Sequence, residues 1–131
     1  MIKIFRDLKV WVKAHALVLE IYRVTSFFPK HERYGLIAQL RRSAVSIATN
    51  IVEGSKRKSR RDFAHFIDIA DGSLEETKYH FLLARDLKYL EGGDFIRIDE
   101  MCDEVGRMLY GFHKKLTAYN LYLTTKGGNY A

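Results

Sequence analysis

The chain has 131 residues, of which 29% are charged and 47% hydrophobic, a balance that suits one globular domain and excludes a disordered chain. Its formal net charge of +6 favours a polyanionic partner. A single proline and long helical periodicities indicate an all-α protein, with one domain over residues 1–131.

Cysteine usage and hydropathy bear on cellular location. Cys102 is the only cysteine, which rules out an internal disulfide and fits a reducing compartment. It falls on an apolar helical stripe, so we expect a buried small side chain rather than a nucleophile. No apolar run approaches the ~18 residues of a membrane span, and residues 1–7 lack the pattern of a signal peptide. We therefore expect a cytoplasmic protein without membrane contact.

The first predicted helix covers residues 7–27, with Asp7 as its cap and Pro29 just beyond its end. Its apolar residues follow steps of four and three: Val10, Ala14, Leu17, Ile21, Val24 and Phe28. This spacing predicts an amphipathic helix that packs on its neighbours. The short connection across Pro29 predicts an antiparallel second helix.

The second predicted helix covers residues 33–53, and we expect Gly54 to end it in a left-handed conformation. Its apolar stripe consists of Ile37, Leu40, Ala44, Ile47 and Ile51. A polar stripe lies on another side and consists of Arg42, Ser46, Asn50 and Glu53. In a monomer this stripe would face water. In an oligomer Arg42, Asn50 and Glu53 are candidate subunit contacts, because Arg42 and Glu53 carry opposite charges.

Five cations follow within six positions, namely Lys56, Arg57, Lys58, Arg60 and Arg61. Lysine and arginine bind phosphate through charge, and arginine adds a two-pronged hydrogen bond. These five residues are the candidate nucleic-acid-binding site. They would bind phosphates mostly without a preference for the nucleic-acid sequence. Arg41 and Arg42 are further candidates that would equally suit structural roles. Without a polyanion the run would be a solvated connection between helices, and both interpretations stay open.

The third predicted helix covers residues 60–91, with Ser59 as its cap and continuity across Gly72. Its main stripe consists of Phe63, Ile67, Ala70, Leu74, Thr77, Phe81 and Ala84. A second apolar line consists of Phe66, Ile69, Leu83, Leu87 and Leu90. This second line indicates self-association or a protein partner, with Leu83 and Leu87 as candidate contacts. Because Phe63 and Phe66 are expected in the core, stacking on nucleic-acid bases is not indicated.

The fourth predicted helix covers residues 94–120, after a turn at Gly92 and Gly93 and with Asp94 as its cap. Its stripe alternates steps of three and four without interruption: Phe95, Ile98, Cys102, Val105, Leu109, Phe112 and Leu116. Residues 124–131 are expected to form a frayed tail. Four helices with short links predict an antiparallel, up-down-up-down four-helix bundle.

Motifs that carry chemistry are missing from the sequence. Di-iron bundles typically carry Glu-x-x-His on two helices, and the chain has no such motif. Gly-x-Ser-x-Gly, the P-loop and Gly-x-Gly-x-x-Gly are also missing. We therefore expect neither an enzyme nor a bound metal or cofactor.

Several longer motifs carry a resemblance. They are Phe28-Pro29-Lys30-x-Glu32-Arg33-Tyr34-Gly35-Leu36, Gln39-Leu40-Arg41-Arg42-Ser43-Ala44-Val45-Ser46-Ile47, Asn50-Ile51-Val52-Glu53-Gly54-Ser55 and Phe63-x-x-Phe66-x-x-x-Ala70-x-Gly72-Ser73-Leu74-x-Glu76. Across residues 5–116 the chain closely resembles the four-helix-bundle proteins encoded in 23S rRNA intervening sequences. That family is similar to the accessory variability determinants of diversity-generating retroelements, which bind nucleic acid and a reverse transcriptase. The resemblance implies a homopentameric ring of antiparallel four-helix bundles with a basic surface suited to RNA or DNA.

Two functional hypotheses remain. The first is a non-enzymatic, oligomeric protein that binds RNA or DNA phosphates or acts as a scaffold. The second is a protein-interaction adaptor that does not bind nucleic acid and uses the second apolar line of the third helix.

Overall fold

The computed structural model describes residues 4–125, with the side chains of residues 4–118, and all regular secondary structure in this part of the chain is helical. Its elements in order are the 3-10 helix η1 (Phe5–Asp7), α1 (Lys9–Thr25), the 3-10 helix η2 (Lys30–Glu32), α2 (Leu36–Ser55), α3 (Arg60–Asp86) and α4 (Gly92–Thr125). The predicted all-α class is confirmed. The fourth helix continues past its predicted end at residue 120, and Thr124 and Thr125 of the predicted tail belong to it. The rest of the predicted tail, residues 126–131, lies outside the described residues.

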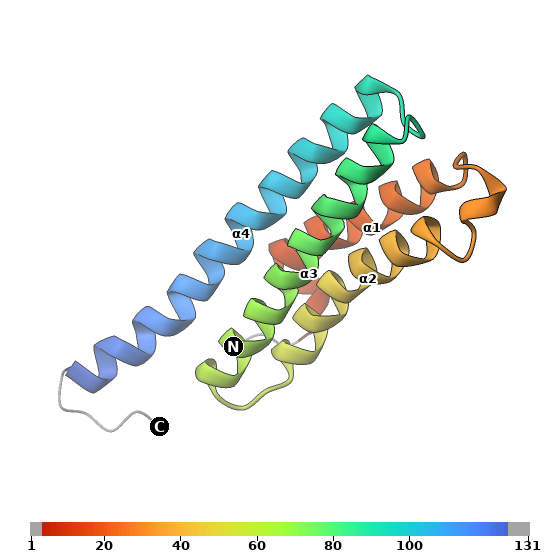
Figure 1. The fold of residues 1–131 in the computed structure, drawn as a ribbon. Helices are drawn as coiled ribbons and strands as arrows, with labels where there is room; N and C mark the ends of the chain where they lie inside the picture. Colours follow the sequence, from red (N-terminus) through yellow and green to blue (C-terminus); the bar gives the residue numbers. More distant parts are fainter. Residues whose placement is uncertain (1–3, 126–131) are drawn as a thin grey trace.

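The four long helices form a closed bundle (Figure 1). Each packs on its neighbour in sequence, and α1 also packs on α4. Short connections make sequence neighbours antiparallel, so the starts of α1 and α3 lie at the same end as the close of α2. The late part of α4 extends past that end (Figure 1). No described helix combines the length and the apolar character that a membrane span requires.

The predicted stripes supply the core. Fully buried side chains come from all four helices and include Leu17, Ile21, Leu40, Ile47, Ile51, Ile67, Leu74, Phe81, Ile98, Val105 and Leu109. Cys102 is 1% exposed, as predicted for a small packed side chain. Burial raises the pKa of the Cys102 thiol to about 12, so this group stays protonated and unreactive at neutral pH.

Small polar residues line the contact between α2 and α3. The Thr77 hydroxyl donates to Ser43 Oγ at 2.8 Å, and Ser46 Oγ lies 2.9 Å from Ser73 Oγ. Asn50 donates its amide to the Ser46 carbonyl oxygen at 2.8 Å. The middle of the polar stripe on α2 therefore faces α3, and its predicted exposure to water is wrong there. Serine and threonine are small enough to let the helices approach while they satisfy each other's hydroxyl groups.

Three predicted helix starts are wrong in detail, and one of them is that of α2, which begins at Leu36 rather than at residue 33. Asp7 belongs to η1, and α1 begins at Lys9 after Leu8 with no side-chain cap. Asp94 does not cap α4 either, because α4 begins at Gly92 and Asp94 forms ion pairs instead. Ser59 is the cap that the sequence predicted correctly, since its hydroxyl accepts the backbone N–H of Asp62 at 3.0 Å.

The end of α3 also differs from the prediction of residue 91. The helix stops at Asp86 because Lys88 takes a left-handed backbone with φ 66°. The backbone N–H of Tyr89 then reaches back to the Ala84 carbonyl oxygen, and that of Lys88 reaches Arg85, each at 2.9 Å. This is a Schellman ending with lysine where glycine is usual, so the sequence carried no signal for it.

Gly54 plays a different part from the predicted one. It lies inside α2, which continues to Ser55, and it is buried. A Cβ atom at this position would come within 2.8 Å of Phe63 Cδ1 and of Phe66 Cβ on α3. Gly54 is therefore a point of close helix approach rather than a left-handed stop.

A network of four charged side chains joins α1 to the start of α4. Arg97 pairs with Glu20 and with Asp94. Arg23 pairs with the same two carboxylates, and its two ion pairs each measure 3.2 Å. The Arg23 hydrogen bond is the main cause that lowers the pKa of Glu20 below 4.5. The Arg97 hydrogen bond is the main cause that lowers the pKa of Asp94 below 3.8. The charged carboxylates therefore stabilise the folded state.

We expect this network to contribute stability above about pH 4.5 that is lost as the pH falls through the lowered pKa values of the folded state. The double variant Glu20→Gln, Asp94→Asn should lose less of its free energy of unfolding between neutral pH and acid than the wild type does. Urea unfolding across that pH range measures the difference.

Asp71 is a carboxylate whose charge should have the opposite effect on stability, so Asp71→Asn serves as a comparison. Burial, followed by the Glu75 and Asp68 charges, raises the pKa of Asp71 above 3.8, so its charged form destabilises the fold. We expect Asp71→Asn to raise the free energy of unfolding at neutral pH. The variant should also lack the stability that the wild type gains when Asp71 becomes protonated in acid. An identical acid response in all three proteins would contradict both assignments.

Candidate nucleic-acid interface

The predicted basic run forms the connection between α2 and α3. Lys56, Arg57, Lys58, Arg60 and Arg61 all have exposed side chains. Arg57 is held in place, since its guanidinium carbon lies 4.6 Å from the centre of the Phe66 ring. A guanidinium stacked on a ring keeps its N–H edges available for phosphate. The start of α3 lies in the same connection, and the helix dipole adds partial positive charge there.

Other cations reach the same end of the bundle from distant parts of the chain. Arg6 and Lys56 line one open hollow of about 340 Å³. Lys9 and Lys115 line another, between the start of α1 and the late part of α4. We call residues 5–9, 52–62 and 111–118 together the basic end. These segments hold nine Lys or Arg against Asp7, Glu53 and Asp62.

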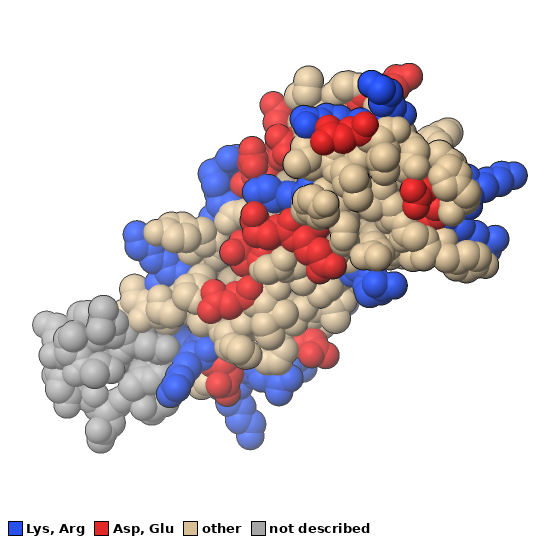
Figure 2. Space-filling model, in the orientation of Figure 1, with Lys and Arg blue, Asp and Glu red and all other residues tan. Residues whose placement is uncertain are grey.

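The charge of the basic end accounts for the charge of the whole protein. Nine basic and three acidic side chains leave +6, which equals the formal net charge of the chain. The remaining residues carry 13 basic and 13 acidic side chains and are neutral as a group. Figure 2 shows several of the basic side chains at this end. The molecule is therefore strongly polarised rather than uniformly basic.

An acidic band covers the middle of α3 and α4 (Figure 2). On α3, Asp68 and Glu75 lie close enough to Asp71 for their charges to act on it. Mutual repulsion contributes to the raised pKa of Asp71, after the larger effect of burial. A polyanion would be repelled from this band and attracted to the basic end, so the charge distribution selects where such a ligand docks.

Arg41 and Arg42 lie away from the basic end, in the first turns of α2. Lys56, the residue that follows α2, lies fifteen positions after Arg41, which corresponds to about 22 Å along the helix axis. Arg41 donates to Thr25 Oγ1 at 2.9 Å, and its guanidinium lies 4.4 Å from the Tyr22 ring centre. Its structural contacts connect α2 to α1. Arg42 is exposed in the same part of α2.

The residues predicted to make subunit contacts differ in how exposed they are. Glu53 is exposed, whereas the amide of Asn50 is occupied by bonds to Ser46. Leu83 on α3 is half-buried against the core of its own chain, and Leu87, the residue just after α3, is 45% exposed. Of the two leucines, Leu87 offers the larger free apolar surface.

Sequence reasoning missed Arg6, Lys9 and Lys115 as members of the site. None of them lies in a run as dense as 56–61, so charge density along the chain did not reveal them. A usable signal did exist. In an up-down-up-down bundle the starts of the odd-numbered helices and the ends of the even-numbered helices share one end. Combining this topology with the charges would have found all three.

Metal chemistry has no evident site in the described part of the chain. Among residues 4–125 no group of three or more His, Cys, Asp or Glu side chains is arranged to hold a metal ion.

Comparisons with known proteins agree with this architecture. The family model for the 23S rRNA-intervening sequence protein matches residues 6–111. The fold is similar to the crystal structure of a protein of unknown function from the S23 ribosomal protein family of Bacteroides thetaiotaomicron VPI-5482. The TM-score is 0.75 at 25% sequence identity, covering 80% of this chain and 98% of the other. A search of the curated proteins found no match.

Proposed function

This chain belongs to the 23S rRNA-intervening sequence protein family, and from that premise we propose that it binds the phosphate backbone of RNA or DNA through its basic end. It acts as an oligomeric binding or scaffold protein and catalyses no reaction. The proposal rests on the observation that three segments from separate parts of the chain meet at one end of the bundle. Together they carry a formal net charge of +6.

Phosphate contacts of this kind are strong and largely independent of sequence. Each phosphate that a cation neutralises releases counterions, so affinity falls steeply with salt. The exposed side chains of the basic end carry no shape complementary to particular bases. The ligand class is therefore nucleic acid in general, read through its backbone.

Assembly would strengthen binding at this end. The homopentameric ring implied by the family resemblance would present the basic end five times around one axis. Several weak backbone contacts on one strand then act together, because the second and later contacts are intramolecular. Glu53 and Arg42, both exposed on α2, and the exposed Leu87 just after α3 are available for the contacts between subunits.

The test is affinity for RNA and for DNA across a salt series. We expect the triple variant Lys56→Gln, Lys58→Gln, Arg61→Gln to bind more weakly, with the slope of log affinity against log salt reduced by about 2–3. The mass of the wild-type assembly in solution, measured on the same sample, should correspond to five subunits.

A matched control removes the same charge at the other end of the bundle. Lys30→Gln, Arg33→Gln, Lys88→Gln also lowers the net charge by three, and all three side chains are exposed. This control should keep the wild-type slope. Equal slopes in both triple variants would show that net charge alone drives binding, and no binding by the wild type would reject the proposal outright.

The alternative function is a protein-interaction adaptor. The observation that favours it is a set of exposed apolar side chains, Tyr79 and Leu82 on α3 and Leu87 just after it, which are 60%, 37% and 45% exposed. Exposed apolar side chains that group on a surface are candidates for protein contacts. If the wild-type protein did not bind nucleic acid even at low salt, that result would favour this alternative.

A further inference from the structure

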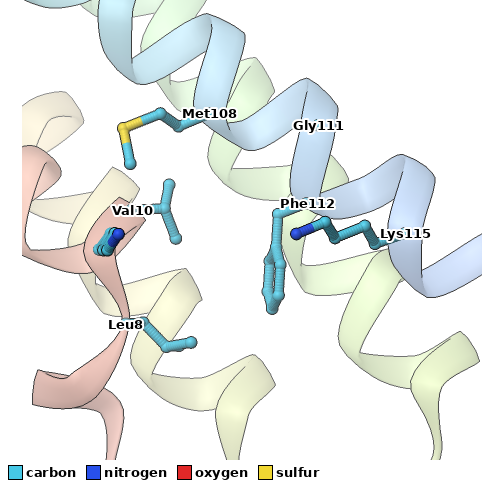
Figure 3. Close-up of a pocket in the computed structure, with 7 residues that line it drawn as sticks. Leu8, Val10, Met108, Gly111, Phe112 and Lys115 are labelled. Carbon is cyan, nitrogen blue, oxygen red and sulfur yellow. The ribbon is translucent and has the colours of Figure 1, made fainter.

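A pocket of about 290 Å³ lies at the basic end between the start of α1 and the late part of α4. Leu8 and Val10 line it from the α1 side, and Met108 and Phe112 line it from α4 (Figure 3). Lys9, Gly111 and Lys115 complete the lining. The volume lies near the lower limit of the ~300–1,000 Å³ range for small-ligand pockets, so it suits one ring-sized group rather than several.

We propose that this pocket receives one unpaired base of a single-stranded nucleic acid whose phosphates lie on the basic end. The inference rests on the proposed function and narrows its ligand to strands with unstacked bases. A base on its strand combines a flat apolar face with flanking negative charges. The pocket offers the complementary combination, apolar walls and two cations.

The aromatic wall has the chemistry that base capture needs. The Phe112 ring hangs from α4 into the space opposite Leu8 and Val10 (Figure 3). Phe63 supports it from the core, with ring centres 5.0 Å apart and the planes at 79°. A supported ring gives a base a preorganised stacking surface, and methionine adds a polarizable one. The expectation that Phe63 and Phe66 leave no aromatic residue for stacking overlooked Phe112.

The pocket also predicts how the base is read. Its lining side chains have no carboxylate, amide or hydroxyl group that could match the hydrogen-bonding edge of a base. Every base has a π-face, so stacking alone tolerates any of them. The structure therefore assigns single-strand preference without sequence preference to this site. Lys9 and Lys115 would contact the phosphates on either side of the captured base.

The test compares two strands with the same number of phosphates. One is a single-stranded oligothymidylate, and the other is an abasic strand that has sugars and phosphates only. We expect the wild type to bind the base-bearing strand at least about fivefold more tightly, because stacking is the only difference between them. Fluorescence anisotropy at one fixed salt concentration measures both affinities.

Gly111 allows the pocket to be filled without touching any charge. It lines the pocket, and no heavy atom lies within 4 Å of the position that a Cβ would take. We expect Gly111→Leu to abolish the difference between the strands and to leave the affinity for the abasic strand unchanged. Gly72→Leu on α3 is the matched control, since Gly72 has the same open surroundings and lies outside the pocket. It should keep the wild-type difference.

A photo-crosslink provides a positional readout. A strand that carries iodouracil should attach to the α4 peptide containing Met108 and Phe112, and Gly111→Leu should suppress that product. If the wild type bound the two strands with equal affinity, this inference would be overturned and the proposed phosphate binding would stand. If the wild type bound neither strand, both proposals would be overturned. A full difference retained in Gly111→Leu would place the base elsewhere and overturn the assignment of this pocket. A fatty acid that fills the pocket while the strands bind equally would assign it to an amphipathic carboxylate instead.

Discussion

Replacing Phe63 by alanine should lower the free energy of unfolding by about 3–5 kcal/mol, the range for a large buried aromatic residue. Phe63 is 6% exposed and joins three helices at the basic end. It belongs to α3, packs edge-on against Phe112 of α4, and closes over Gly54 of α2. Alanine would leave a cavity that these helices can fill only by shifting together. Urea unfolding at neutral pH measures the loss.

The same substitution at an exposed phenylalanine is the control. Phe27 is 78% exposed, so Phe27→Ala should change stability by less than about 0.5 kcal/mol. Phe63→Leu keeps most of the buried volume and should fall between the two. If Phe63→Ala cost no more than Phe27→Ala, the described packing at this end would be wrong.

Gly54→Ala should also destabilise the protein, by about 1–3 kcal/mol, which is the usual cost of overpacking. Helix propensity alone predicts the opposite sign, because alanine is favoured over glycine by about 1 kcal/mol inside a helix. The added methyl group would lie 2.8 Å from both Phe63 Cδ1 and Phe66 Cβ. The Phe66 atom is attached directly to the backbone, so relief requires α2 and α3 to separate.

Gly72→Ala and Gly111→Ala isolate the packing effect. Both glycines lie in helices, and no heavy atom lies within 4 Å of the position that an added methyl group would take. Each substitution should raise the free energy of unfolding by up to about 1 kcal/mol. Thermal or urea unfolding of all three variants gives the comparison. A stabilising Gly54→Ala would mean that the two helices are farther apart than described.

Both sites bear on the proposed function as well as on stability. Gly54 and Phe63 flank the connection that carries Lys56, Arg57 and Lys58. Phe66, the other ring near Gly54, supports the guanidinium of Arg57. Close packing of α2 against α3 therefore fixes the two ends of this connection and the ring that supports Arg57, which would lower the entropy cost of the proposed strand binding.

The helical class and the buried faces followed from the sequence alone. Apolar side chains at steps of three and four, as from Ile98 through Cys102 to Val105, select one face of a helix whatever its neighbours are. Helix ends did not follow in the same way. Gly54 was expected to be left-handed, and only the approach of α3 shows why a residue without a side chain is required there. The stop at Lys88 depends on backbone hydrogen bonds that its side chain does not signal.

The candidate site divides along the same line. The cluster from Lys56 to Arg61 was visible because its cations are neighbours in sequence. Arg6, Lys9 and Lys115 join it only through the antiparallel packing of helices, which brings residues about 50 or more positions apart to one end of the bundle. A pattern along the chain records local periodicity and local charge. The distances between separate helices, and so the pocket beside Phe112, arise only when the helices pack.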